Sequence, residues 1–145
     1  PWDWQNDDAF EAVVFKKLDG GDYSLECMED ILVVERKATV DELFVNFTTN
    51  RDRIKAEFER LKNHKFRILV VEETCDDIMN PFKYYVNKKH INKKSPKMPV
   101  AVVASGLTNL MLEYNVHIIF GGTRAQAMVR GILLRAWELH QAGKL

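Results

Sequence analysis

The sequence predicts an α/β protein with a mixed central sheet flanked by helices. Three short apolar runs rich in Ile and Val, typical of buried strands, occur at residues 31–34, 66–71 and 116–120. Between these runs lie stretches whose apolar residues recur at helical spacing. This order of strands and helices indicates a sheet covered by helices, and such sheets bind ligands beyond their strand ends.

Length and composition favour one folded domain spanning residues 1–145. Single cores reach roughly 100–200 residues before chains divide into domains. The chain has 145 residues, 46% of them hydrophobic and 29% charged, which is typical of a folded globular protein. Lys plus Arg and Asp plus Glu both number 21, so no overall positive field attracts nucleic acid. Any binding to nucleic acid must therefore come from a local patch.

Cysteine content and hydropathy indicate the cellular location to expect for the protein. Cys27 and Cys75 lack the spacing of a zinc site and are too few for a disulfide framework. We therefore expect an intracellular location, in the cytoplasm, nucleoid or nucleus. No apolar stretch approaches the roughly 20 residues that cross a bilayer, and the N-terminus lacks the pattern of a signal peptide. We expect no membrane partner.

The N-terminal part is predicted to contain a strand and a hairpin. Residues 12–17 have the composition of a strand, which ends at a turn marked by Gly20-Gly21. Residues 23–27 alternate in character and are predicted to pair with the strand that begins at Ile31, turning through residues 28–30.

This hairpin would gather charged side chains at its open end. Its register places Asp22 across from Arg36. Glu35 and Lys37 are two residues apart on one strand, so they share a face, whereas Arg36 points to the other face.

Two amphipathic helices are predicted to follow. Thr39 with Glu42 three residues later forms a capping-box pattern, which puts Asp41 in the first helical turn. Asn50 is predicted to cap a second helix over residues 51–63. The apolar positions are Val40, Leu43, Phe44 and Phe47 in the first helix, and Ile54, Phe58 and Leu61 in the second.

A basic segment covers residues 80–99, after the strand 66–71. Its lysines alternate with aromatic residues, and it contains no acidic residue. The lysines would contact DNA phosphates, and Tyr84 and Tyr85 would stack on unpaired bases. A mobile, solvated loop explains the composition equally well. The lysines that we assign to DNA binding are Lys83, Lys88, Lys89, Lys93 and Lys94.

The C-terminal part is predicted to contain a helix, a strand and a last helix. The first helix starts near Pro99 and carries an apolar face up to Tyr114, and residues 116–120 form the strand. Gly121-Gly122-Thr123 turns into a helix over residues 124–141. Capping is the simpler role for Thr123, and Arg124 is a candidate phosphate contact. The residues expected to face inward on this helix are Met128, Ile132 and Leu139.

Asp22, Glu35, Lys37 and Asp41 form a candidate metal centre. Carboxylates that converge repel one another unless a cation lies between them, and oxygen ligands favour Mg²⁺ or Mn²⁺. Asp22 and Glu35 are the predicted metal ligands. Lys37 would orient or deprotonate the attacking water and offset charge on the pentacovalent phosphate. Asp41 would position this lysine or bind the metal through water.

The alternative is a hairpin with solvated ends. In that arrangement Glu35 and Lys37 form a surface ion pair that contributes about 0–1 kcal/mol to stability. The spacing of the residues leaves both interpretations open. Glu72, at the end of the strand 66–71, either joins the active centre or ends in water.

The pattern resembles the Gly-Asp…Glu-Arg-Lys-x-x-x-Asp signature of the XPF-type structure-specific endonucleases. These nucleases are similar to the wider PD-(D/E)xK, restriction-endonuclease-like group. Gly21-Asp22 supplies the first part of the signature, and Glu35-Arg36-Lys37 with Asp41 supplies the second at the full spacing. The likeness extends over roughly residues 11–142, of which only the signature is specific.

The resemblance implies magnesium-dependent hydrolysis of DNA phosphodiester bonds near a branch or fork, and dimers of the nuclease domain. Asp22 and Glu35 match the metal ligands of the family, and Lys37 matches its catalytic lysine. Arg36 and Asp41 match supporting positions of the active site.

The sequence departs from the family in two respects. Family members carry an earlier strand that ends in Asp-x-Arg-Glu, so we expect the first strand and one active-site carboxylate to be missing from this chain. The tandem helix-hairpin-helix domain of the larger relatives is also absent from the sequence. The alternative function is therefore a catalytically incomplete nuclease-like domain that binds branched DNA or serves as a dimer partner.

Overall fold

The computed structural model describes residues 2–80 and 100–145. The predicted basic segment, with Lys83, Lys88, Lys89, Lys93 and Lys94, lies outside the described residues. Across the described residues, no helix is both long and apolar enough to cross a membrane.

Three parallel strands form the centre of the molecule, in the order β1 (Leu32–Lys37), β2 (Phe66–Val71) and β3 (Val116–Phe120). All three agree with the predicted strands. Their β-branched residues suit a sheet that is covered on both sides. Because the strands are parallel, their carboxyl ends meet at one edge, where Lys37 of β1 pairs with Val71 of β2.

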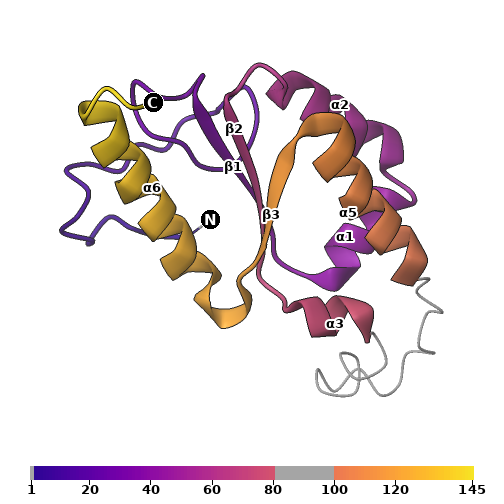
Figure 1. The fold of residues 1–145 in the computed structure, drawn as a ribbon. Coiled ribbons are helices and arrows are strands. Elements are labelled where there is room, and N and C mark those ends of the chain that lie inside the picture. Colours follow the sequence, from indigo (N-terminus) through magenta and orange to yellow (C-terminus); the bar gives the residue numbers. More distant parts are fainter. Residues whose placement is uncertain (1, 81–99) are drawn as a thin grey trace.

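Helices cover both faces of this sheet (Figure 1). On one face lie α1 (Val40–Phe47), α2 (Arg51–Leu61), α3 (Cys75–Met79) and α5 (Val100–Tyr114). On the other face lie α6 (Ala125–Gln141) and the N-terminal residues. The predicted α/β class, a sheet flanked by helices, is confirmed, and the arrangement is compatible with a restriction-endonuclease-like fold.

Alternate residues of β1 enter two different cores. Val33 packs with Leu43, Phe58 and other residues of α1, α2 and α5. Val34 packs on the opposite face with residues of α6. The period of two along the strand therefore directs Glu35 and Lys37 towards the α1 and α2 side, and Arg36 towards the α6 side.

The start of α1 agrees closely with the predicted cap. The Thr39 hydroxyl accepts a hydrogen bond from the Glu42 N–H at 3.1 Å. The Glu42 carboxylate accepts from the N–H of Ala38 at 2.9 Å, one residue before the partner that a standard capping box uses. Asn50 precedes α2 but makes no side-chain cap, and α2 ends at Leu61, two residues before the predicted end.

Two predictions for the N-terminal part are corrected by the structure. Residues 12–17 form no strand, and Val14 and Phe15 remain 67% and 63% exposed, because no strand in the described part of the chain pairs with them. The predicted hairpin is reduced to one antiparallel bridge, from Tyr23 to Val34.

Two predictions for the last helix are also wrong. Thr123 lies within a 3₁₀ turn, η1 (Gly122–Arg124), and its side chain does not cap α6. The buried face of α6 is rotated from the predicted one, and Met128 is 41% exposed. The residues that α6 buries are Ala125, Val129, Leu133 and Ala136.

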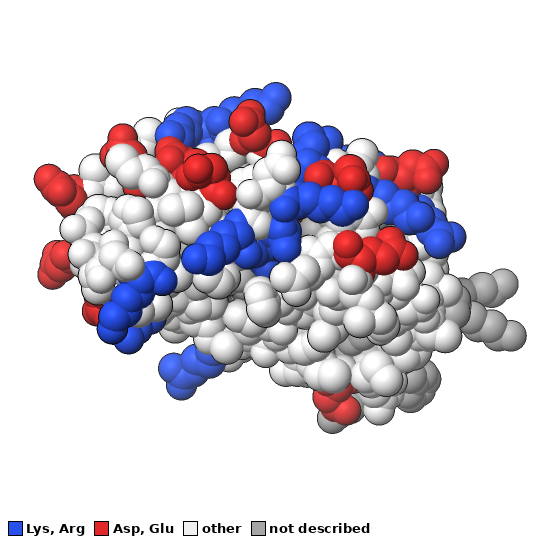
Figure 2. Space-filling model, turned by 45° about the horizontal axis from the view of Figure 1, so that its top comes forward, with Lys and Arg blue, Asp and Glu red and all other residues white. Residues whose placement is uncertain are grey.

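Charges of both signs are mixed on one face of the molecule (Figure 2). On the face shown in Figure 2, Lys and Arg side chains are interspersed with Asp and Glu. This agrees with the zero formal net charge of the chain.

Candidate active site

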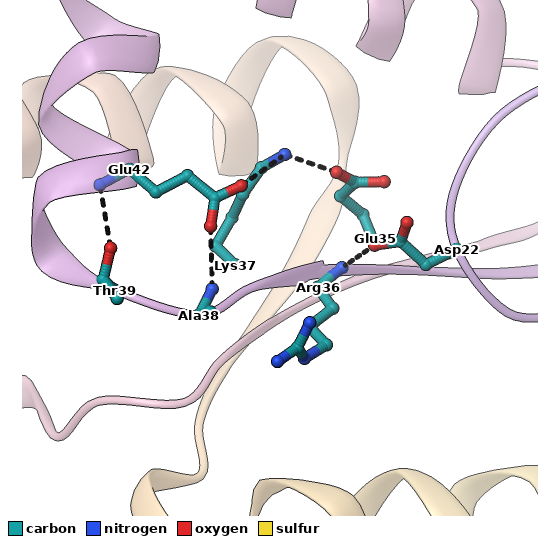
Figure 3. A network of polar contacts seen from close by, with 7 residues as sticks. All are labelled: Asp22, Glu35, Arg36, Lys37, Ala38, Thr39 and Glu42. Carbon is teal, nitrogen blue, oxygen red and sulfur yellow. Dashed lines mark hydrogen bonds and ion pairs between the residues drawn. The ribbon is translucent and has the colours of Figure 1, made fainter. Parts of the chain in front are cut away.

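β1 brings Glu35 and Lys37 together in a buried ion pair. Each residue is 6% exposed, and the Lys37 ammonium donates a hydrogen bond to the Glu35 carboxylate (Figure 3). A buried pair of this kind carries a large desolvation cost, and removing one partner typically costs about 3–5 kcal/mol. The alternative of a solvated surface pair is therefore wrong for these two residues.

The loop before β1 places Asp22 beside Glu35 (Figure 3). The Asp22 N–H donates to the Val34 carbonyl at 2.8 Å, and the Asp22 carboxylate accepts from the backbone N–H of Arg36 at 2.8 Å. Gly21 makes this approach possible because its φ is +74° and a Cβ there would lie 2.2 Å from Val33. The lack of room for a side chain at position 21 therefore explains why glycine precedes Asp22 in the signature.

Burial and a neighbouring negative charge disfavour the ionised form of Glu35, although the Lys37 ammonium lies beside it. Burial raises the pKa of Glu35 to about 8; the neighbouring Lys37 opposes this effect and the charge of Asp22 adds to it. Burial lowers the pKa of Lys37, but the charge and hydrogen bond of Glu35, with the charges of Glu57 and Glu42, act the other way, and the net direction is upward. The pair therefore favours additional positive charge beside Glu35 and keeps Lys37 protonated.

The donor set fits a magnesium or manganese ion. Both carboxylates are hard oxygen donors, and Mg²⁺ commonly binds through one or two carboxylates plus substrate phosphate. Among residues 2–80 and 100–145, no group of three or more His, Cys, Asp or Glu side chains could hold a metal. Asp22 and Glu35 remain the predicted ligands of the ion.

Glu42 is a second acidic neighbour of Lys37. One of its carboxylate oxygens lies 3.7 Å from the Lys37 ammonium, and the other accepts from the Ala38 N–H (Figure 3). The sequence identified Glu42 as a capping residue and missed its contact with Lys37. The start of α1 is thus attached directly to the candidate site.

The Arg36 side chain lies away from the other signature residues. It hydrogen bonds with Glu72 at the end of β2 and stacks over the ring of Trp2, at 5.2 Å from the ring centroid. Glu72 therefore neither joins the Glu35 cluster nor ends free in water.

The two remaining site residues, Asp41 and Arg124, are exposed. Asp41 is in the first turn of α1. Arg124 is in η1, which follows β3, and so lies beyond the same edge of the sheet as Lys37.

A surface pocket of about 280 Å³ lies elsewhere, between α5 and the pair α1 and α2. It is lined by Phe47, Ile54, Leu110 and other residues of these helices, and none of the predicted site residues lines it. The candidate site is therefore defined by its buried charges and not by this pocket.

A comparison with protein families identifies the chain. The model of the ERCC4 domain matches residues 6–128, a stretch that contains Asp22, Glu35, Lys37 and Asp41. No curated protein and no solved structure matches the sequence. Since the match covers most of the 145 residues, and the signature lies within it, the chain belongs to the ERCC4 domain family, consistent with an XPF-type nuclease domain.

Proposed function

We propose that this domain is a metal-dependent endonuclease that hydrolyses DNA phosphodiester bonds near branches or forks. Family membership supports a nuclease domain that acts on DNA. The observation that carries the proposal is the buried Glu35–Lys37 pair with Asp22 beside it. A buried charged cluster is costly for a fold, so a role in chemistry accounts for it better than stability does.

Asp22 and Glu35 would hold Mg²⁺ or Mn²⁺. A bound ion of this kind lowers the pKa of water and polarises a phosphoryl oxygen. Lys37 is held by Glu35 and lies near Glu42, and its raised pKa favours a permanently charged side chain. We therefore assign Lys37 to offsetting the charge of the pentacovalent phosphate, rather than to removing a proton from water.

Other residues of the proposed function lie around this centre. Arg124 is exposed at the same edge of the sheet and would contact a DNA phosphate, together with the predicted basic segment. Asp41 would support Lys37 from the start of α1. Both cysteines are free thiols, which favours a location in a reducing, intracellular compartment.

Cleavage assays test the proposal. Forked and linear DNA duplexes are incubated with the protein in Mg²⁺, and we expect the forked duplex to be cut, with no cutting in EDTA. Glu35→Gln and Lys37→Met are each expected to slow cleavage by about 100-fold or more. Folding of each variant is checked by circular dichroism, because both substitutions disturb a buried pair.

Matched controls replace surface residues of the same types. Glu26→Gln changes an exposed carboxylate, and Lys62→Met removes a lysine that pairs on the surface with Glu59. Both controls are expected to cut at the wild-type rate. Folded wild-type protein that cuts neither duplex, in Mg²⁺ or Mn²⁺, would contradict the proposal.

The alternative is a domain that binds branched DNA without cutting it. One observation favours it: the charged groups of the site already have partners within the chain, since Glu35 pairs with Lys37 and Asp22 with the Arg36 N–H. In that case Asp22→Asn and Glu35→Gln would leave fork binding unchanged, and the wild type would cut nothing.

A further inference from the structure

Glu42 is attached to the candidate site by both oxygens of its carboxylate. One oxygen lies 3.7 Å from the Lys37 ammonium, and the other accepts a hydrogen bond from the Ala38 N–H at 2.9 Å. In Figure 3 the ammonium lies between this carboxylate and that of Glu35. Lys37 therefore has a carboxylate on each side, although the signature in the sequence includes only Glu35.

Capping of α1 does not by itself explain where the Glu42 carboxylate lies. In a standard capping box the acidic side chain accepts from the N–H of the capping residue itself. The helix α3 has this arrangement, since Asp77 accepts from the N–H of Thr74 at 2.9 Å. In α1 the carboxylate accepts instead from Ala38, the residue before the cap, which directly follows Lys37. This shift brings the carboxylate one residue closer to the end of β1.

The two carboxylate partners of Lys37 differ in their burial. The side chains of Lys37 and Glu35 are 8% and 7% exposed, whereas that of Glu42 is 42% exposed. An ammonium has three N–H donors, which need acceptors when the group is buried, and Glu35 supplies one acceptor oxygen. Glu42 thus brings a second negative charge to a buried ammonium from the solvent side.

The proposed function gives Glu35 two roles, as a metal ligand and as a partner of Lys37. A cation beside a carboxylate offsets its negative charge, so the carboxylate then attracts an ammonium less strongly. Glu42 is not a predicted ligand, and its hydrogen bond with Ala38 holds its carboxylate in place independently of Glu35. Its attraction for Lys37 is therefore not weakened when Glu35 serves as a ligand.

We propose that Glu42 is a positioning residue, which holds the Lys37 ammonium at the site while Glu35 serves as a metal ligand. The inference rests on the proposed function. Lys37 has to stay in place to offset the charge of the phosphate, because displacement of an acting group by about 1 Å can slow a reaction by about 100-fold. Glu42 acts in this role through Lys37, without contacting the substrate.

The coupling between Glu42 and Lys37 can be measured without cleavage. Urea unfolding in EDTA compares the effect of Glu42→Gln in the wild type with its effect in Lys37→Met. The amide oxygen of the variant can still accept from Ala38, and any loss of capping is the same in both backgrounds, so the difference isolates the contact with Lys37. We expect Glu42→Gln to lower the folding equilibrium constant about 5-fold more in the wild type than in Lys37→Met.

A second pair of backgrounds, Glu35→Gln and Glu35→Gln/Lys37→Met, keeps the test available if Lys37→Met does not fold. Neutralising both members of a buried pair costs less than leaving one charge without its partner. The expected coupling is larger in this pair, because the Glu35 charge no longer competes with Glu42 for the ammonium.

Asp77→Asn is the matched control, because it changes the capping acid of α3. Its effect on folding should be the same in the wild type and in Lys37→Met. In cleavage assays at saturating Mg²⁺, Glu42→Gln should lower kcat about 10-fold and leave the KM for forked DNA unchanged, since it alters the position of Lys37 and not the binding of DNA. Asp77→Asn should keep the wild-type kcat, because loss of a cap alone does not slow the folded enzyme.

The outcomes separate this inference from the proposed function. If the wild type cuts forked DNA, an equal effect of Glu42→Gln on folding in both backgrounds would overturn the role of Glu42 alone, as would an unchanged kcat. A folded wild type that cuts neither duplex would overturn the proposed function, and the positioning role of Glu42 with it, whatever coupling the unfolding measurements show.

Discussion

Arg36 connects three parts of the chain on the sheet face opposite to Glu35. It hydrogen bonds with Glu72 and stacks over Trp2, and the side chains of Arg36 and Glu72 are 26% and 24% exposed. We expect Arg36→Met to lower the free energy of unfolding by about 1–3 kcal/mol, because a partly buried charged hydrogen bond and a cation–π contact are both lost. Urea denaturation measures the change.

The control for Arg36 is a fully surface pair. Arg135 and Glu138 are 67% and 62% exposed and lie one helical turn apart in α6. Arg135→Met is expected to change the unfolding free energy by less than about 0.5 kcal/mol. Equal effects of the two substitutions would show that the Arg36 contacts contribute no more than a surface pair does.

Single residues of the site were predictable where local geometry decides their position. The period of two along a strand placed Glu35 and Lys37 on one face, and the structure agrees. The burial of this pair and the approach of Glu42 to Lys37 were not predictable. They depend on how α1 and α2 pack on the sheet, and local spacing does not specify that packing.

At the scale of elements, an ion pair attaches the N-terminal segment to α6. Arg130 donates two hydrogen bonds to Asp7, and these, together with one from the Ala9 N–H, lower the pKa of Asp7 from 3.8 to about 2. Because this pKa is lowered by folding, the stabilisation is present above pH 3.8 and is lost as the pH falls through about 2. Asp7→Asn should therefore reduce stability at neutral pH, and its difference from the wild type should shrink below pH 3.8.

Thermal unfolding of both proteins over a series of pH values measures this difference. Asp8→Asn changes the adjacent exposed carboxylate and is the matched control, with little effect expected at any pH. A difference between Asp7→Asn and the wild type that stays constant down to the lowest pH would contradict the ion pair as the cause.

Long periodic elements were predictable, and short or unpaired ones were not. The strands at 66–71 and 116–120 agree with the structure because apolar residues rich in Ile and Val dominate each of them. Residues 12–17 have a similar composition, but among residues 2–80 and 100–145 no strand pairs with their backbone. The helix α3 has five residues, too few for a helical period, and its capping box from Thr74 to Asp77 was the available signal.

For the whole molecule, the division of helices between the two sheet faces limits where a dimer can form. The resemblance to XPF-type nucleases implies dimers, and the C-terminal helices α5 and α6, which carry exposed apolar residues, cover opposite faces of the sheet (Figure 1). One continuous interface can therefore include α5 or α6, but not both helices. Met128, 41% exposed, shares one flank of α6 with Ile132 and Leu139, which are partly exposed.

We expect this flank of α6 to form the dimer interface, with two-fold symmetry placing the same flank of each subunit in contact. Sedimentation velocity over a range of concentrations should show a dimer, and Met128→Glu should shift the protein to monomer by placing a charge in an apolar contact. Trp137→Glu is the matched control, since Trp137 is 44% exposed on the other flank of the same helix. A wild type that remains monomeric at every concentration would contradict the interface, as would a Met128→Glu variant that dimerises like Trp137→Glu.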